Sequence, residues 1–361
     1  MEIKMDNFYE QLARRPRLDL VIEEAEKEFW NKTFEGSNEI TMYSWARNGW
    51  IENLRDNIKH FGYFNRDHSV KIYANELVNS PVILVGAGPS LALNIEGLKL
   101  AKEKKIPIMC SSHALMYLAD LDIKPDFVVM LDAGKMWDDY LNAGEMDMSD
   151  VPLIADQVCD PAQLKTWKGP VKFFKAAAPM ESKISQFVQM EMNRLVPVRE
   201  NASQIEVGGH VMGAMLSLAR GIFASNNIIF VGADYCSEFN PTGPGKFYPF
   251  EKKIDQIVNT ENPDGSFSDK PAAPVYDGQA VDIFNRTVFT NGSYLGFKNV
   301  IDSSIKQNKM ASNPVEDLDF INATEGGLLG SLKGGLSKFM LYMRLQDAIF
   351  YSENKRIAKG G

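Results

Sequence analysis

The chain contains little cysteine. Its 361 residues include three cysteines, Cys110, Cys159 and Cys236, which are widely spaced and form no C-x-x-C pair. Disulfide frameworks and cysteine zinc sites need closer or regularly patterned cysteines, so this spacing argues against both. We therefore expect a protein of a reducing compartment.

Long hydrophobic runs are also missing. No apolar stretch reaches the roughly 20 residues that cross a bilayer. Residues 1–17 are charged and lack the apolar centre of a signal peptide. These absences predict a cytoplasmic protein that does not act in a membrane.

The chain also lacks an excess of basic residues. The chain has 39 Lys and Arg against 47 Asp and Glu, which gives a formal net charge of −8. Binding to duplex nucleic acid relies on Lys and Arg that neutralise phosphates, so nucleic acid is disfavoured as a partner. The length allows a large core and two domains of about 150 residues each. It leaves the oligomeric state open.

Residues 76–235 alternate between apolar strands and helical segments. Continuous apolar strands are typical of a parallel sheet covered on both faces. We therefore predict an α/β fold with a Rossmann-like, mainly parallel sheet and helices on both faces. The strand candidates are Val82–Val85, Ile106–Cys110, Phe127–Leu131, Leu153–Ala155, Val171–Phe174 and Ile228–Val231. The helix candidates are Ile95–Lys104, Ala114–Leu121, Ser182–Asn193 and His210–Phe223.

The same patterns divide the chain into three regions. Residues 1–75 are expected to form a helical N-terminal cap, with helices over 19–30 and 42–61. Residues 76–330 are expected to form the Rossmann-like domain, and residues 331–361 a C-terminal helix, over 334–357, with a tail. Residues 236–310 are rich in Pro, Gly, Asn and Asp and predict little regular structure. Within them, residues 239–250 are a candidate lid.

The first predicted strand is followed by the turn Gly86-Ala87-Gly88-Pro89-Ser90. Glycines let the backbone approach a phosphate, and the following helix start presents free N–H groups, so the turn predicts a nucleotide site. No third glycine follows, and no acidic residue ends the next strand, which disfavours a nicotinamide dinucleotide. A tight turn without a ligand is the alternative.

Two carboxylates directly follow predicted strands. Asp132, two residues before Gly134, follows one strand, and Asp234 follows another. The carboxyl ends of parallel strands gather at one edge of a sheet, where ligands bind, so these side chains should converge. An Asp there can hold a ribose hydroxyl, a magnesium ion or an acceptor hydroxyl, and a structural turn is the alternative.

Small residues and histidines occupy two further connections. They are Ser111, Ser112 and His113 after the second strand, and Gly208, Gly209 and His210 at the start of the last predicted helix. Glycines at a helix start expose N–H groups to an anion. A histidine there can act as a base or bind a phosphate, and a structural histidine is the alternative.

Two later motifs give weaker signals. A turn at Gly326 would bring Thr324 and Glu325 into the cleft, and an ordinary surface turn fits equally well. Residues 317–319 match the D-x-D pattern of metal-dependent glycosyltransferases. Three letters match often by chance, and the next residues predict the start of a strand.

Four segments, in this order, resemble one family: Gly86–Leu91, Pro125–Asp132, Gly208–Tyr235 and Asn322–Gly327. The chain resembles the motility accessory factors of flagellin glycosylation and the related MptE-like 6-hydroxymethylpterin diphosphokinases. Its glycine turn is also similar to that of Rossmann-like bacterial sialyltransferases. The resemblance implies a transferase with a nucleotide-activated substrate. That substrate would be a CMP-linked nonulosonic acid, delivered to a Ser or Thr hydroxyl, or ATP with magnesium, giving pyrophosphate.

Departures from the family pattern favour the glycosyltransferase branch. The pterin kinases carry a denser acidic cluster where this chain has only Asp132, and extra carboxylates would help to hold magnesium. A diphosphokinase acting on a hydroxymethyl pterin or base and a non-catalytic nucleotide-binding protein stay as alternatives, and the donor stays open. The expected roles are phosphate contacts from Gly86, Gly88 and Ser90, pocket walls from Ser111 and Ser112, positioning by Asp132 and Asp234, and a base at His210.

Overall fold

The computed structural model describes most of the chain. The described residues are 17–18, 49–62, 67–133, 141–177, 190, 194–195, 204–249, 257–261, 267–271, 278–312 and 317–358. The expected helix over 19–30, Gly134, and all but one residue of Ser182–Asn193 lie outside them. None of the helices in the described ranges combines the length and apolar character needed to cross a bilayer.

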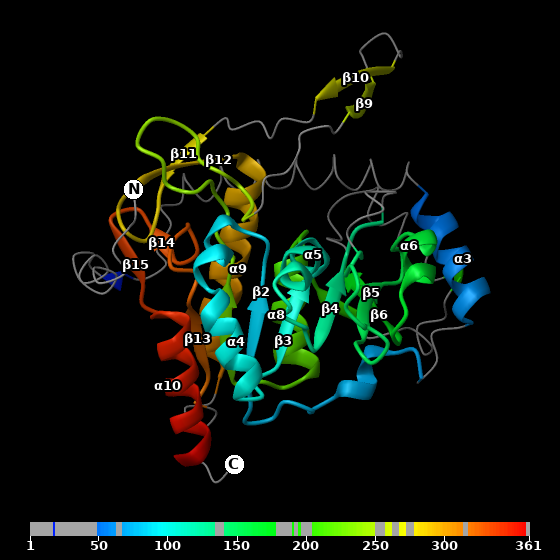
Figure 1. Ribbon diagram of the computed structural model, residues 1–361, viewed down its shortest axis with the longest axis horizontal. Coiled ribbons are helices and arrows are strands. Elements are labelled where there is room, and N and C mark those ends of the chain that lie inside the picture. Colours follow the sequence, from blue (N-terminus) through cyan, green and yellow to red (C-terminus); the bar gives the residue numbers. More distant parts are fainter. Residues whose placement is uncertain are drawn as a thin grey trace.

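A nine-stranded sheet forms the centre of the fold (Figure 1). Its strand order is β16-β13-β8-β2-β3-β4-β5-β6-β7, and every neighbouring pair is parallel. The strands are β2 Pro81–Val85, β3 Ile108–Ser111, β4 Phe127–Met130, β5 Leu153–Asp156, β6 Val171–Ala177, β7 Gln204–Glu206, β8 Asn227–Val231, β13 Asp319–Asn322 and β16 Leu341–Tyr342. The six predicted strands and the Rossmann-like α/β class are confirmed.

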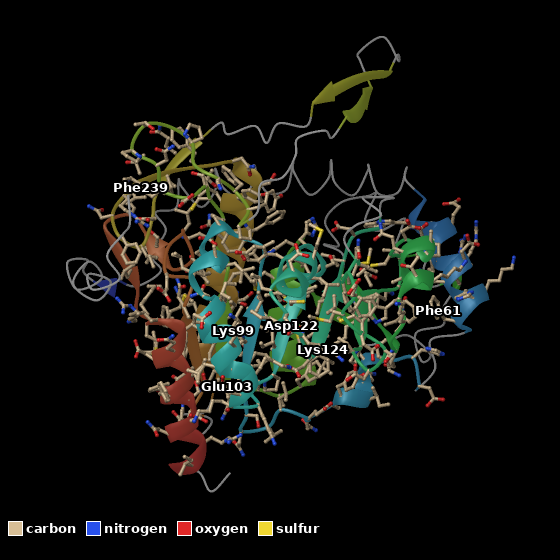
Figure 2. The ribbon with its side chains drawn as sticks, in the orientation of Figure 1. Phe61, Lys99, Glu103, Asp122, Lys124 and Phe239 are labelled. Carbon is tan, nitrogen blue, oxygen red and sulfur yellow. The ribbon has the colours of Figure 1, made fainter. Side chains whose placement is uncertain are left out.

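Helices cover both faces of the sheet. In β2, Ile83 and Val85 face one core, whereas Val82 and Leu84 face the other. Side chains fill the space between the sheet and the helices (Figure 2). The first core includes residues of α3 Trp50–Phe61, α4 Ile95–Glu103, α5 Ser112–Asp120, α6 Pro161–Thr166 and α10 Leu345–Ala358. The second includes residues of α8 Val211–Ser217, its continuation Leu218–Ile222, and α9 Gly292–Ala311.

The order of the strands reverses between β2 and β8. From β2 the chain adds strands in one direction as far as β7, and then places β8, β13 and β16 on the other side of β2. Open parallel sheets bind ligands at such a reversal, outside the carboxyl ends of the strands. The connections that follow β2 and β8 are therefore the first place to seek a site.

Residues 236–310 contain more regular structure than the sequence predicts. Two antiparallel hairpins precede the 20-residue helix α9; they are β9 Ile257–Glu261 with β10 Phe267–Pro271, and β11 Gly278–Val281 with β12 Thr287–Thr290. The prediction of little regular structure was wrong for α9 because this helix buries polar residues. Lys298 and Asp302 lie one turn apart, both buried, and form an ion pair at 2.8 Å. This pair interrupts the apolar stripe that would mark the helix in the sequence.

The C-terminal helix begins later than predicted. The pattern predicts a helix over 334–357, but α10 starts at Leu345, and β15 Gly335–Ser337 and β16 precede it. β15 pairs with β14 Ser331–Leu332 through a turn at Gly334, whose φ of +87° glycine adopts without strain, and with β1 Arg17–Leu18. β16 then joins the main sheet beside β13.

Candidate active site

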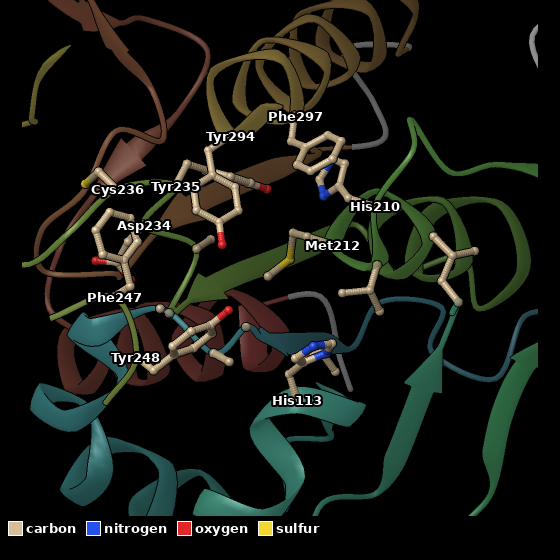
Figure 3. A pocket seen from close by; sticks show the side chains of 18 of the residues that line it. His113, His210, Met212, Asp234, Tyr235, Cys236, Phe247, Tyr248, Tyr294 and Phe297 are labelled. Atoms are coloured by element: carbon tan, nitrogen blue, oxygen red, sulfur yellow. The ribbon is translucent and has the colours of Figure 1, made fainter. Parts of the chain in front are cut away.

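A cavity of about 380 Å³ lies at the carboxyl ends of β2, β3, β4 and β8, where the strand order reverses (Figure 3). Residues from several separate segments of the chain meet there. The expected site residues that line it are Gly86, Gly88, Ser111, His113, Asp132, Gly209, His210 and Asp234. The cavity therefore gathers both predicted carboxylates and both predicted histidines.

Glycines allow the turns after β2 and β8 to touch. The Gly86 amide donates to the Val231 carbonyl at 2.8 Å, and the Gly88 amide donates to the Gly232 carbonyl at 2.9 Å. A Cβ on Gly86 would lie 2.5 Å from the Gly232 oxygen. The close approach of two backbones thus explains glycine here. Because both amides have protein partners, a phosphate at this edge needs other N–H groups.

Asp234 is a buried carboxylate in the wall of the cavity. Its Oδ2 accepts a hydrogen bond from Ser90 Oγ at 2.8 Å, and a Cβ on Gly88 would lie only 2.0 Å from the same oxygen. Burial raises the pKa of Asp234 to about 7, although the hydrogen bonds from Ser90 oppose this rise. A carboxyl group with this pKa can take up or release a proton near neutral pH.

Tyr235 and His210 carry two buried polar atoms without a hydrogen-bond partner, Tyr235 Oη and His210 Nε2. The two rings meet edge to face at 5.8 Å. The His210 imidazole bonds to the backbone of Phe297, and burial lowers its pKa to about 3, so it is neutral at physiological pH. Nε2 can then accept a hydrogen bond and Tyr235 Oη can donate one. Buried polar atoms rarely lack partners, so this pair is a distinctive polar part of an otherwise aromatic wall.

Aromatic rings supply much of the cavity wall. Phe297 stacks on His210 with ring centroids 4.7 Å apart, and Phe247 stacks on Tyr294 at 6.1 Å. The hydroxyl groups of Tyr294 and Tyr248 point into the cavity (Figure 3). No Lys or Arg is among the described residues that line it. Flat walls with a few polar groups suit a planar heterocycle.

Asp132 and the start of α8 complete the lining. Asp132 follows β4 and is half-buried, and Gly209 and His210 lead directly into α8. The first N–H groups of a helix have no partner within the helix and attract anions. The cavity thus combines a half-buried carboxylate, a buried carboxylate and a set of backbone donors.

Sequence comparison places this chain among known proteins. A model of the family described as 6-hydroxymethylpterin diphosphokinase MptE-like matches residues 49–239, which is more than half of the chain. The chain belongs to the MptE-like family. The matched stretch begins at Gly49, the N-cap of α3, and extends beyond β8. It therefore includes α3 together with β2 to β8, and it confirms the family that the sequence motifs resemble.

A solved structure shares the fold of this MptE-like chain. It is the MAf glycosyltransferase from Magnetospirillum magneticum AMB-1, with a TM-score of 0.52 and 17% sequence identity. The likeness covers 81% of this chain and 41% of that protein, so the chain spans less than half of its relative's length. No curated protein sequence matches the chain.

Several expected site residues do not line the cavity: Pro89, Ser90, Ser112, Gly208, Thr324, Glu325 and Gly326. Ser90 instead binds Asp234. Thr324 Oγ1 donates to the Gly326 carbonyl at 2.7 Å. Glu325 accepts a hydrogen bond from Asn94, the N-cap of α4, and one from the backbone at Leu345, where α10 begins. Glu325 therefore joins the end of β13 to α4 and α10, whereas Thr324 bonds within its own turn.

The D-x-D motif lies at the opposite edge of the sheet. Asp319 is the first residue of β13, at the amino end of that strand. Its carboxylate binds Lys309 at 3.2 Å, Lys355 at 2.5 Å and Tyr351 Oη at 2.7 Å. Lys355 also binds Asp317 at 2.8 Å. The motif is thus part of an ion network that joins α9, β13 and α10.

Sequence reasoning missed the aromatic wall. Tyr294 and Phe297 belong to α9, whose apolar stripe is interrupted, and Phe247 and Tyr248 belong to the candidate lid, whose composition predicts a loop without indicating what it covers. Within the described part of the chain, no group of three or more His, Cys, Asp or Glu is placed to hold a metal ion.

Proposed function

We propose that this protein is a transferase that binds a nucleotide-activated donor in the cavity and transfers its sugar to a hydroxyl acceptor. The donor we favour is CMP-linked. The observation that carries the proposal is the cavity at the strand reversal, which combines aromatic walls with a buried carboxylate of raised pKa. Membership of the MptE-like family and a fold shared with a glycosyltransferase support it.

The base of the nucleotide would lie against the aromatic wall. Tyr235 Oη would donate to an acceptor on its edge, and His210 Nε2 would accept from a donor. The first N–H groups of α8 would face the phosphate, since the Gly86 and Gly88 amides are engaged elsewhere. This arrangement suits the leaving nucleotide, whose negative charge grows as the glycosidic bond breaks.

Asp234 would act as the general base. The acceptor oxygen forms a bond to the anomeric carbon, the bond from that carbon to the donor phosphate breaks, and the acceptor proton passes to Asp234. The nucleotide leaves with the bonding electrons. A pKa of about 7 suits this role, whereas the pKa of His210, about 3, makes it a weak base. His210 is therefore assigned to ligand binding, and Asp132 to positioning the acceptor or ribose hydroxyl.

A diphosphokinase is the second candidate, because the matching family model carries that description and a pterin ring would also suit the aromatic wall. Transfer of pyrophosphate from ATP needs magnesium held near the phosphates. Mg²⁺ at such sites is held by one or two carboxylates together with the substrate phosphates, and Asp132 and Asp234 line the cavity. Glycosyl transfer is preferred because the chain has only Asp132 where the pterin kinases carry a denser acidic cluster, and because Asp234 is bound to Ser90.

The first test is a thermal-shift screen with CMP, CDP, UDP, GDP, AMP and ATP, each with and without magnesium. A ligand that binds the folded state raises the unfolding midpoint. The proposal expects stabilisation by CMP that magnesium does not change. Stabilisation only by ATP or AMP with magnesium would replace it with the diphosphokinase.

The second test compares two carboxylates. Asp132→Asn should reduce turnover of a CMP-sugar without loss of folding. Asp150→Asn is the matched control, because Asp150 is exposed, pairs with Lys124 and precedes β5 at the other edge of the sheet. Full activity in Asp132→Asn would remove Asp132 from the site. Binding of CMP without turnover of any donor would indicate a binding protein.

A further inference from the structure

Helix α3 is attached to the sheet by two asparagine side chains that lie one helical turn apart. Asn53 Nδ2 donates to the carbonyls of Ala133, at 2.7 Å, and Val158, at 3.0 Å. Asn57 Nδ2 donates to the carbonyls of Gln157, at 3.0 Å, and Cys159, at 2.9 Å. Each amide thus binds two backbone carbonyls at the carboxyl edge of the sheet.

The two asparagines bind different segments. Ala133 follows β4 and is the neighbour of Asp132 in the cavity wall, whereas Val158 follows β5. Asn53 therefore joins the Asp132 loop to the loop after β5. The Asn57 amide donates both of its hydrogen bonds to the loop after β5, although its chemistry and the number of these bonds are the same.

Both loops carry carboxyl groups. Asp132 follows β4, Asp156 is the last residue of β5, and Asp160 is the N-cap of α6. Like charges repel, and the repulsion is stronger in a partly buried setting. A hydrogen-bonding group that binds both loops opposes their separation. Of the two asparagines, Asn53 alone has this arrangement.

We propose that Asn53 is a positioning residue, which fixes Asp132 in the cavity by joining its loop to the loop after β5. The proposal rests on the proposed function for its effect on turnover, but the structural part is independent of it. It assigns to α3 a role in the site, beyond that of a cap on the domain.

Hydrogen exchange provides the first test. Asn53→Ala and Asn57→Ala keep α3 helical because alanine is the best helix former. Asn53→Ala should increase exchange in peptides that cover residues 127–133, and both variants should increase it over residues 154–163. Equal exchange over 127–133 in the two variants would overturn the proposal, whether or not the protein turns over a donor.

Kinetics provide the second test. Asn53→Ala should lower kcat for the donor about tenfold, as expected when a reacting group is displaced, and Asn57→Ala should change kcat less than twofold despite an equal or larger fall in Tm. In an Asp132→Asn background, Asn53→Ala should have no further effect on kcat. An equal loss in both backgrounds would overturn the proposal. Absence of turnover in the unmutated protein would instead reject the proposed function, and the exchange result would still decide the role of Asn53.

Discussion

Asp234 and Asp319 adjoin neighbouring strands of the sheet but lie in contrasting environments. Asp234 follows the carboxyl end of β8, receives hydrogen bonds from Ser90 and has a pKa raised by burial to about 7. Asp319 begins β13 at the amino end, binds Lys309, Lys355 and Tyr351, and has a pKa below its ordinary value because these partners outweigh its burial.

The two environments distinguish a carboxylate that stabilises the folded state from one whose burial destabilises it. A paired carboxylate is held in its charged form and joins segments of the chain. A buried carboxylate without a neighbouring cation is less stable in its charged form. Groups whose pKa is perturbed in this way concentrate at functional sites. Asp319, the last residue of the D-x-D motif, is therefore the structural member of this pair.

We expect the largest effect from a substitution that adds a side-chain atom beside Asp234. In Gly88→Ala, a Cβ 2.0 Å from Asp234 Oδ2 and 2.7 Å from the Gly232 oxygen should lower the free energy of unfolding by about 3 kcal/mol. Gly221→Ala is the control, because a Cβ there meets no atom within 4 Å. Urea unfolding measures both. An unchanged midpoint in Gly88→Ala would show that the two turns do not pack as described.

Asp234→Asn and Asp319→Asn should separate activity from stability. Asp234→Asn removes the proposed base and should lower kcat about 100-fold. Asp319→Asn breaks an ion network and should lower the free energy of unfolding by about 1 kcal/mol or more, with kcat unchanged. Steady-state kinetics and urea unfolding test the pair. Equal kcat in the two variants would remove the functional side of the contrast.

The pH dependence of stability should have opposite signs for these two residues. The folded-state pKa of Asp234 is raised, so its contribution is fully present below about pH 4 and is lost as pH rises through about 7. Asp234→Asn should therefore gain stability relative to the unmutated protein over this range. The folded-state pKa of Asp319 is lowered, so the deficit of Asp319→Asn should shrink as pH falls below the ordinary aspartate pKa.

Chemical unfolding of both variants between pH 3 and pH 8 would measure these slopes. Difference values are needed, because burial also raises the pKa of Asp156 to about 7 and lowers that of His210 to about 3. Slopes of the same sign for Asp234→Asn and Asp319→Asn would contradict the assigned environments.

Two Tyr→Phe substitutions should have the smallest effects, and they form the most closely matched pair. Tyr351→Phe removes a hydrogen bond of 2.7 Å to Asp319 and should cost about 1 kcal/mol of stability. Tyr235→Phe removes a buried hydroxyl without a partner, so the free energy of unfolding should stay the same or rise, while nucleotide affinity falls about fivefold. Calorimetric titration with CMP and thermal unfolding check both. Equal loss of stability would show that Tyr235 has a partner within the protein.

Much of the central fold could be predicted from the sequence, because its strands are continuous apolar runs that both faces of the sheet bury. Predicting His113, Asp132 and Asp234 at one site needed only the rule that strand ends converge, and His210 was predicted from the glycines at the start of its helix. The aromatic wall could not be predicted, because Tyr294 and Phe297 lie on a helix whose buried stripe contains Lys298 and Asp302. The engagement of Ser90 with Asp234, 144 positions away, depends on the pairing of β2 with β8.

The most direct measurement of the central claim is a calorimetric titration of CMP into the unmutated protein, Val211→Trp and Ile72→Trp. Val211 is the first residue of α8 and lines the cavity, so tryptophan there should fill the cavity, whereas Ile72 is 53% exposed and does not line it. The account predicts one CMP per chain in the unmutated protein and in Ile72→Trp, and affinity at least tenfold weaker in Val211→Trp. Equal affinity in all three proteins, or no binding to the unmutated protein, would contradict it.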